Sequence, residues 1–195
     1  MSIVERTVGI LAFDDMEVLD YAGPYEVFNV AGEVSGGAFR TYAIGVDAGS
    51  QVGRGGFTVV PPASIADTEL PTILVVPGGA GTRPLLRRPE VLAWVTRAAE
   101  HAELVLSVCT GALVLAGAGV LAATRATTHH GAFDELGALM PEVEVVSGER
   151  FVQNSQRVWT SGGISAGIDL SLHIVGLLAG EDTRAAVVEE MEWLW

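Results

Sequence analysis

Short apolar runs alternate with stretches of helical spacing along the first part of this chain, and this alternation restricts the fold more than any other feature. Four runs rich in β-branched residues have the length and composition of strands that are buried on both faces. They are TVGILAF (residues 7–13), RTYAIGV (40–46), TILVVP (72–77) and ELVLSV (103–108). Strands that alternate with helices predict an α/β fold with a mainly parallel sheet, in which ligands bind beyond the carboxyl ends of the strands.

The remaining segments predict the helices and a few shorter strands. Gly23 and Pro24 predict the start of a first helix, and Pro89 suits the first position of a helix over residues 89–101. Residues 163–180 are apolar or small nearly all round, which predicts a buried helix, and Asp182 has the position of an N-cap for a last one. A further helix is predicted over 129–140, and short strands over 142–146, 150–153 and 157–163.

Composition and charge restrict the class of protein. Hydrophobic residues make up 49% and charged residues 18% of the 195 residues, which predicts one well-packed domain over residues 1–195. The net charge of −13 repels phosphate backbones and anionic lipids, so we expect no nucleic-acid or membrane partner. No apolar run reaches the roughly 18 residues of a membrane span, and no signal peptide is recognisable, so we expect a cytoplasmic protein.

The only cysteine, Cys109, lies where the run LVLSV (104–108) leads directly into a helical stretch. A strand that enters a helix without a loop is typical of a nucleophile elbow, with Gly111 leaving room for the close crossing. The amino end of a helix favours a thiolate, so this position predicts a reactive thiol. The alternative is that Cys109 is a small buried hydrophobic residue.

Two other turns at the predicted sheet edge carry candidate residues. Gly78 and Gly79 follow the third apolar run, and their N–H groups could form an oxyanion hole with that of Thr110, or an ordinary glycine turn. Among the acidic residues that follow the first run, Asp20 has apolar neighbours on both sides, whereas Asp14, Asp15 and Glu17 are predicted to be solvated. A buried Asp20 carboxyl would have a raised pKa and could act as an acid.

The four histidines are candidate bases and metal ligands. His129 and His130 follow the short segment RATT (125–128) and could reach the strand ends, whereas His101 and His173 are predicted to be structural. The histidines and the single cysteine lack the spacing of a zinc site, so we expect no metal.

Three segments, PGGAGT (77–82), SVCTGALVLAGAGVLAATRATTHH (107–130) and WTSGGISAGIDL (159–170), resemble the DJ-1/PfpI superfamily. Together with LDYAGPYEVF (19–28), they are most similar to the branch of this superfamily that hydrates isocyanides. The resemblance implies a flavodoxin-like three-layer sandwich, a homodimer, Cys109 as nucleophile and Asp20 as its acidic partner. Thr110 stands where the protease-like members have histidine, which argues against a protease.

The same resemblance implies cysteine-dependent hydration of a small isocyanide to a formamide, with no cofactor. Thr110 would position the turn, His129 would contribute to substrate binding, and Gly162, Gly163 and Ile164 would line the pocket unless they serve only helix packing. One alternative is a glyoxalase or deglycase acting on α-oxoaldehydes, against which Asp20 in place of a glutamate argues. Another is a non-enzymatic sensor in which Cys109 is oxidised or binds a metabolite.

Overall fold

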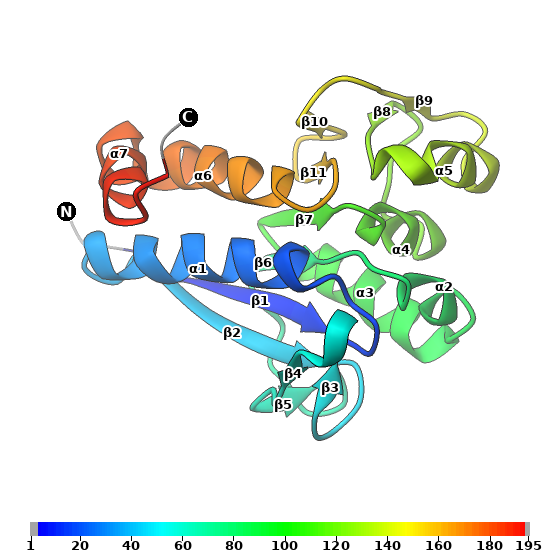
Figure 1. The fold of residues 1–195 in the computed structure, drawn as a ribbon, viewed down its shortest axis with the longest axis horizontal. Helices are drawn as coiled ribbons and strands as arrows, with labels where there is room; N and C mark the ends of the chain where they lie inside the picture. The colour runs from blue at the N-terminus through cyan, green and yellow to red at the C-terminus, as the bar shows by residue number, and fades with distance from the viewer. Residues whose placement is uncertain (1–3, 194–195) are drawn as a thin grey trace.

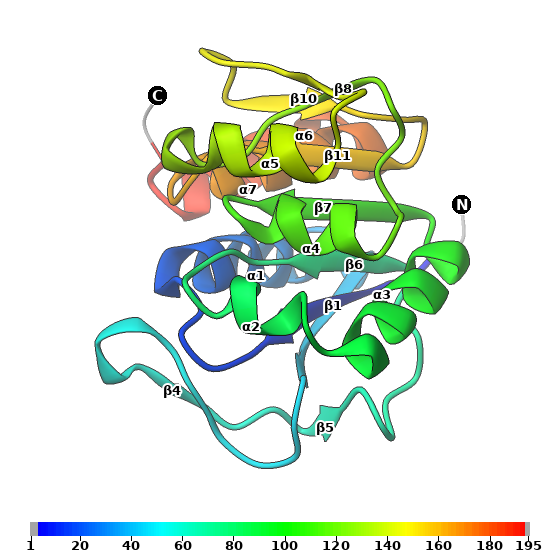
Figure 2. The same ribbon diagram turned by 90° about the vertical axis from the view of Figure 1, so that its right-hand side faces the viewer.

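A seven-stranded sheet forms the centre of the computed structural model, which describes residues 4–193 (Figures 1 and 2). The strand order is β10-β11-β7-β6-β1-β2-β5, and every neighbouring pair is parallel except β10 and β11. The strands are β1 (Arg6–Ala12), β2 (Phe39–Gly45), β5 (Ala63–Ser64), β6 (Ile73–Val76), β7 (Leu104–Val108), β10 (Phe151–Gln153) and β11 (Val158–Ser161). The predicted mainly parallel sheet is therefore confirmed.

Helices cover both faces of this sheet. Helices α1 and α6 lie side by side against one face with α7 next to them, and α3 and α4 cover the other face (Figures 1 and 2). The helices are α1 (Val18–Val34), α2 (Thr82–Leu85), α3 (Pro89–His101), α4 (Gly111–Gly117), α5 (Phe133–Leu139), α6 (Ala166–Ala179) and α7 (Glu181–Glu190), with short 3₁₀ turns η1 (Arg54–Gly56) and η2 (His130–Ala132). This arrangement is the predicted three-layer sandwich.

Burial explains why the central strands are continuous apolar runs. All the residues of β6 and β7 are buried, because helices cover the sheet on both sides. Two small ribbons complete the structure: β3 (Gln51–Val52) pairs antiparallel with β4 (Thr58–Val59), and β8 (Arg125–Ala126) pairs parallel with β9 (Glu144–Val145). The turn η1 connects the two strands of the first ribbon, and it lies near the edge where the parallel strands end.

The predicted start of the first helix was wrong. Helix α1 begins at Val18, so Pro24 lies inside it and Asp20 belongs to its first turn. The N–H of Tyr21 already donates to the carbonyl oxygen of Glu17 at 3.3 Å. Proline is tolerated here because the preceding turn is packed: Asp20 and Tyr21 are both buried, which holds the helix in place ahead of the proline.

Two helix predictions near the carboxyl end also need correction. Gly180, with a φ of 90°, precedes α7, and Asp182 lies within the first turn rather than at the cap. Glycine takes this position because the backbone there is left-handed. Helix α6 is not buried all round, since Leu177 is 59% exposed and His173 is half-buried.

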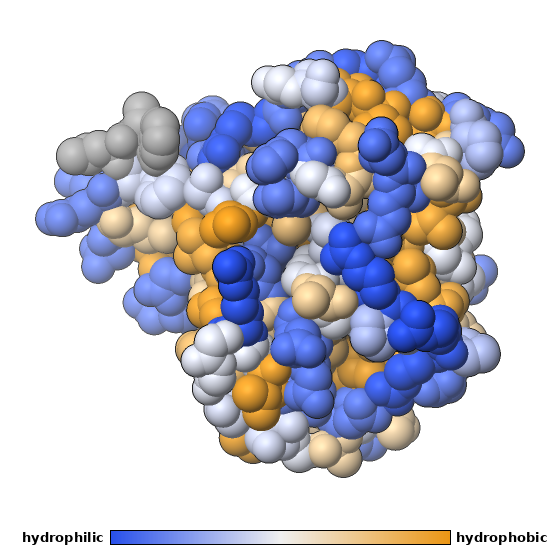
Figure 3. All heavy atoms as spheres, turned by 45° about the vertical axis from the view of Figure 1, so that its right-hand side comes forward, coloured by the Kyte–Doolittle hydropathy of each residue, from blue (hydrophilic) through white to orange (hydrophobic). Residues whose placement is uncertain are grey.

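The surface mixes hydrophilic and apolar side chains on the face that Figure 3 shows. Among residues 4–193, no helix combines the length and the hydropathy that a bilayer crossing requires.

Candidate active site

Cys109 lies at the junction of β7 and α4, as the sequence predicts. Strand β7 ends at Val108 and α4 begins at Gly111, and Cys109 has a φ of 55°, in the left-handed region. Such a backbone is strained for a residue with a side chain and persists only where neighbours hold it. The Cys109 N–H donates to the carbonyl oxygens of Ser161 and Gly162, both at 3.1 Å, and the Thr128 hydroxyl donates to the Cys109 carbonyl at 2.7 Å.

Gly111 allows α4 to start this close to the sheet. A Cβ at Gly111 would lie 2.0 Å from the carbonyl oxygen of Val76 in β6, a distance that no side chain can adopt. The glycine therefore permits the tight strand-to-helix crossing that directs the Cys109 side chain beyond the carboxyl edge of the sheet.

Asp20 lies fully buried next to Cys109. Its Oδ2 accepts the Gly78 N–H at 3.2 Å and its Oδ1 accepts the Ile164 N–H at 3.0 Å, and the Cys109 thiol is a further hydrogen-bond partner. Burial raises the pKa of Asp20 to about 7, even though these hydrogen bonds lower it. The carboxyl predicted to be inward-facing and raised in pKa is therefore present, and near neutral pH it can both accept and release a proton.

The thiol is not activated in the predicted way. Burial and, after it, the charge of the neighbouring Asp20 raise the pKa of Cys109 to about 12, although the N–H and hydroxyl of Thr110 oppose this. The amino end of α4 acts in the predicted direction, since the Thr110 N–H lowers the pKa of Cys109, but burial and the Asp20 charge outweigh it, and the thiol resists ionisation. A base close to the sulfur must therefore take the proton, and Asp20 is in position to do so.

The glycine turn after β6 holds the acid and the threonine in place. The Gly78 N–H donates to Asp20, and the Gly79 N–H donates to Thr110 Oγ1 at 2.9 Å. Both N–H groups therefore already donate to acceptors inside the protein, so Gly78 and Gly79 do not form the predicted oxyanion hole. The Thr110 N–H is the member of that set that interacts with the Cys109 sulfur.

The segment after β11 closes the site from the other side. Ile164 has a φ of 56°, donates its N–H to Asp20 and is 38% exposed. A Cβ at Gly163 would lie 2.4 Å from His129 Cδ2 and 3.4 Å from Cys109 Sγ, so this glycine packs directly against the histidine and the thiol. Gly162 contributes its carbonyl to the Cys109 N–H.

His129 lies at the edge of the site, with its ring 4.2 Å from that of His130. Its Nδ1 accepts the Gly131 N–H at 3.1 Å, which assigns the ring proton to Nε2. Burial lowers the pKa of His129, so the ring is neutral and presents an N–H donor. His101 is exposed on α3, and His173 stacks on Phe151 and Trp159, in agreement with structural roles.

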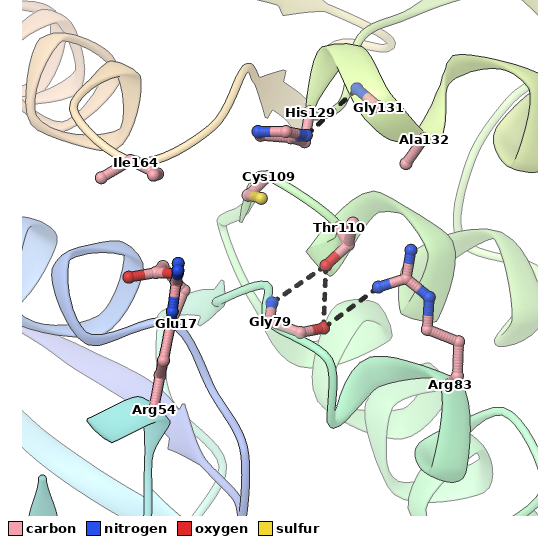
Figure 4. A pocket seen from close by; sticks show the side chains of 10 residues that line it. All are labelled: Glu17, Arg54, Gly79, Arg83, Cys109, Thr110, His129, Gly131, Ala132 and Ile164. Atoms are coloured by element: carbon pink, nitrogen blue, oxygen red, sulfur yellow. Dashed lines mark hydrogen bonds and ion pairs between the residues drawn. The ribbon is translucent and has the colours of Figure 1, made fainter. Parts of the chain in front are cut away.

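A cavity of about 190 Å³ opens over the thiol (Figure 4). The lining includes Cys109, Thr110, His129, Gly79 and Ile164, as predicted, whereas the predicted Gly78, Gly162 and Gly163 and the fully buried Asp20 lie outside it. The sequence prediction missed five lining residues: the charged Glu17, Arg54 and Arg83, and the small Gly131 and Ala132. Figure 4 shows Glu17 and Arg54 on one side of the cavity and Arg83 on the other. Within residues 4–193, no group of three or more histidine, cysteine and acidic side chains is arranged to hold a metal ion.

The family profile of DJ-1/PfpI matches residues 6–177. This chain belongs to the DJ-1/PfpI family. An isonitrile hydratase from Pseudomonas putida is 33% identical over 186 residues, which cover 95% of this chain and 78% of the hydratase. The HTH-type transcriptional regulator GbdR from Pseudomonas aeruginosa is 25% identical over 94% of this chain. The chain spans only 50% of that regulator.

Solved structures of the family have the same fold. A ThiJ/PfpI family protein from Pseudomonas syringae superposes with a TM-score of 0.87 and 25% identity, over 98% of this chain and 76% of its own. DJ-1beta from Drosophila melanogaster superposes with a TM-score of 0.82 over 98% of this chain and all of its own, at 18% identity. The second likeness supports the fold alone.

Proposed function

We propose that this protein adds water to small isocyanides, R–N≡C, and releases N-substituted formamides. The observation that carries this proposal is the contact between the Cys109 thiol and the buried Asp20 carboxyl, whose pKa of about 7 suits proton transfer in both directions. The terminal carbon of an isocyanide must accept a nucleophile and a proton, and this pair supplies both. The similarity to an isonitrile hydratase supports the same chemistry.

In the first half of the proposed reaction, Asp20 accepts the thiol proton while Cys109 Sγ bonds to the terminal isocyanide carbon. Asp20 then delivers that proton to the same carbon, which gives a thioimidate, R–N=CH–S–Cys. The Thr110 N–H, which interacts with the sulfur, stabilises the negative charge that develops there. Asp20 ends this half as a carboxylate again.

In the second half, water adds to the thioimidate carbon, and the nitrogen gains a proton. The C–S bond of the resulting tetrahedral intermediate then breaks, and the hydroxyl proton of the intermediate returns to the sulfur through Asp20. The product is R–NH–CHO, and the thiol is restored. Nucleophile and proton donor both come from this chain, so the proposed reaction uses no cofactor.

An assay with 4-nitrophenyl isocyanide, in which formamide is followed by absorbance and identified by mass spectrometry, tests this proposal. We expect turnover by the wild type and a loss on the order of a thousandfold in Cys109→Ala and Asp20→Asn. The matched control is Asp15→Asn, because Asp15 is an exposed aspartate in the turn just before α1 and should be dispensable. A wild type that leaves the isocyanide unchanged and its own thiol unmodified would exclude the hydratase function.

The similarity to transcriptional regulators supports a second candidate, a ligand-sensing or redox-sensing module. A sensor would bind the isocyanide or another electrophile at Cys109 without turnover, or Cys109 would be oxidised by dilute peroxide. Parallel incubations with methylglyoxal and with peroxide separate the candidates. Lactate formed from methylglyoxal would indicate the glyoxalase alternative, and oxidation of Cys109 by peroxide without isocyanide turnover would indicate a sensor.

A further inference from the structure

The proposed hydration requires proton transfer at two places, at the sulfur and at the water that attacks the thioimidate. Asp20 serves the sulfur, but it is fully buried, and both of its oxygens already accept backbone N–H groups, from Gly78 and Ile164. Asp20 also lies outside the set of residues that line the cavity over the thiol. Water that enters this cavity therefore meets other side chains, and one of them must take its proton.

Most polar side chains in the lining cannot do this. Arg54 and Arg83 carry donors only. The Thr110 hydroxyl accepts the Gly79 N–H at 2.9 Å and donates to the Gly79 carbonyl at 3.1 Å, so it is already engaged. His129 Nδ1 accepts the Gly131 N–H, which leaves Nε2 protonated and able to donate only.

Glu17 is the remaining polar side chain of the lining, and the structure holds it firmly. It is the residue immediately before α1, and its N–H donates to the Gly78 carbonyl at 2.9 Å. Arg54 Nη1 donates to Glu17 Oε2 at 2.7 Å. Throughout residues 4–193, no donor is bonded to the other oxygen, Oε1. The Glu17 side chain is 16% exposed, so it is partly shielded yet open to the cavity (Figure 4).

Arg54 is anchored to the same segment as Glu17, so the pair is set up before substrate binds. The Arg54 N–H donates to the Met16 carbonyl oxygen at 2.9 Å. A Cβ added to Gly53 would lie 3.1 Å from the same oxygen, so this turn packs closely against Met16. Burial is the main cause of the raised pKa of Asp20, and the Glu17 charge also raises it, which indicates that the two carboxyl groups are close enough to interact.

We propose that Glu17 is the general base that activates water in the second half of the reaction, while Asp20 serves the thiol in the first. Glu17 Oε1 takes a proton from water as the water oxygen bonds to the thioimidate carbon, and then passes this proton to the nitrogen. Arg54 fixes the Glu17 carboxylate through Oε2 and leaves Oε1 free to accept a proton. This inference rests on the proposed hydration and divides its two proton transfers between two carboxyl groups.

The test is intact-protein mass spectrometry after rapid mixing with 4-nitrophenyl isocyanide. Glu17→Gln should accumulate an adduct of one isocyanide on Cys109 and release formamide on the order of a hundredfold more slowly than the wild type. Asp20→Asn should form neither adduct nor formamide. Glu33→Gln, the same substitution at an exposed position of α1, should behave as the wild type.

The outcomes distinguish the inference from the function on which it rests. Glu17→Gln turning over at the wild-type rate, or failing to form the adduct as Asp20→Asn does, would overturn the role of Glu17 while hydration stands. Absence of turnover and adduct in the wild type would remove both. If Glu17→Gln does not fold, Glu17→Asp decides, because a carboxylate drawn back by one methylene should form the adduct normally and release product slowly.

Discussion

At the scale of single residues, one environment acts on two proton-binding groups. Burial raises the pKa of the Cys109 thiol to about 12 and that of the Asp20 carboxyl to about 7. Below pH 7 both groups hold their protons, and above it the pair holds a single proton. Only this singly protonated pair has a base, Asp20, that can release the thiolate.

The pH dependence of the reaction follows from this titration. We expect kcat/KM for 4-nitrophenyl isocyanide to rise about tenfold per pH unit below pH 7 and to level off above it, because Asp20 must be ionised to accept the thiol proton. Initial rates between pH 5 and pH 9, in buffers of constant ionic strength, measure this. A rate that fell as Asp20 became ionised would mean that the protonated acid is the active form.

Local sequence identifies some of these residues and not others. Cys109 stands at a strand-to-helix junction and Asp20 among apolar neighbours, so the residues next to each predict its place. Glu17 is adjacent to exposed acidic residues, and its local pattern predicts a solvated side chain. Its role depends on Arg54, which lies 37 residues away on η1, and the packing of that turn against Met16 leaves no signal in the sequence around either residue.

At the scale of elements, the site depends on how closely α4 approaches β6. The Cys109 backbone keeps its left-handed conformation because β11, the segment after it and Thr128 supply hydrogen bonds to it. Strands β1, β2, β6 and β7 were predictable since each is an uninterrupted apolar run between turns. The start of α1 was not, because a Gly-Pro pair ordinarily begins a helix and the burial of the preceding turn is a tertiary effect.

Gly111→Ala tests this close approach. The added methyl group would meet the Val76 carbonyl at 2.0 Å, so β6 and α4 must separate, and we expect a loss of about 3 kcal/mol in the free energy of unfolding together with a loss of activity. Gly137→Ala on α5 is the matched control, since its nearest neighbour would be Val145 Cγ2 at 3.8 Å, and alanine should add up to about 1 kcal/mol. Urea unfolding measures both. Equal stability of the two variants would show that the elbow tolerates displacement of the helix.

At the scale of the whole molecule, the net charge of −13 influences how copies of the chain meet. The homodimer that the family resemblance implies stays a prediction, and each copy would bring this charge to the interface. Salt screens such repulsion, since the Debye length falls from about 30 Å at 0.01 M to about 8 Å at 0.15 M ionic strength. Dimerisation should therefore strengthen as salt is added.

Sedimentation equilibrium at 0.01 M and 0.15 M sodium chloride measures this directly. We expect a dimer at both salt concentrations, with a dissociation constant several-fold lower at the higher one, because apolar contacts resist salt while the repulsion between two acidic chains weakens. A dimer that weakens with salt would instead mean that ion pairs hold the interface, against the overall charge. A monomer at both salt concentrations would contradict the homodimer, and the cavity over Cys109 would then be complete within one chain.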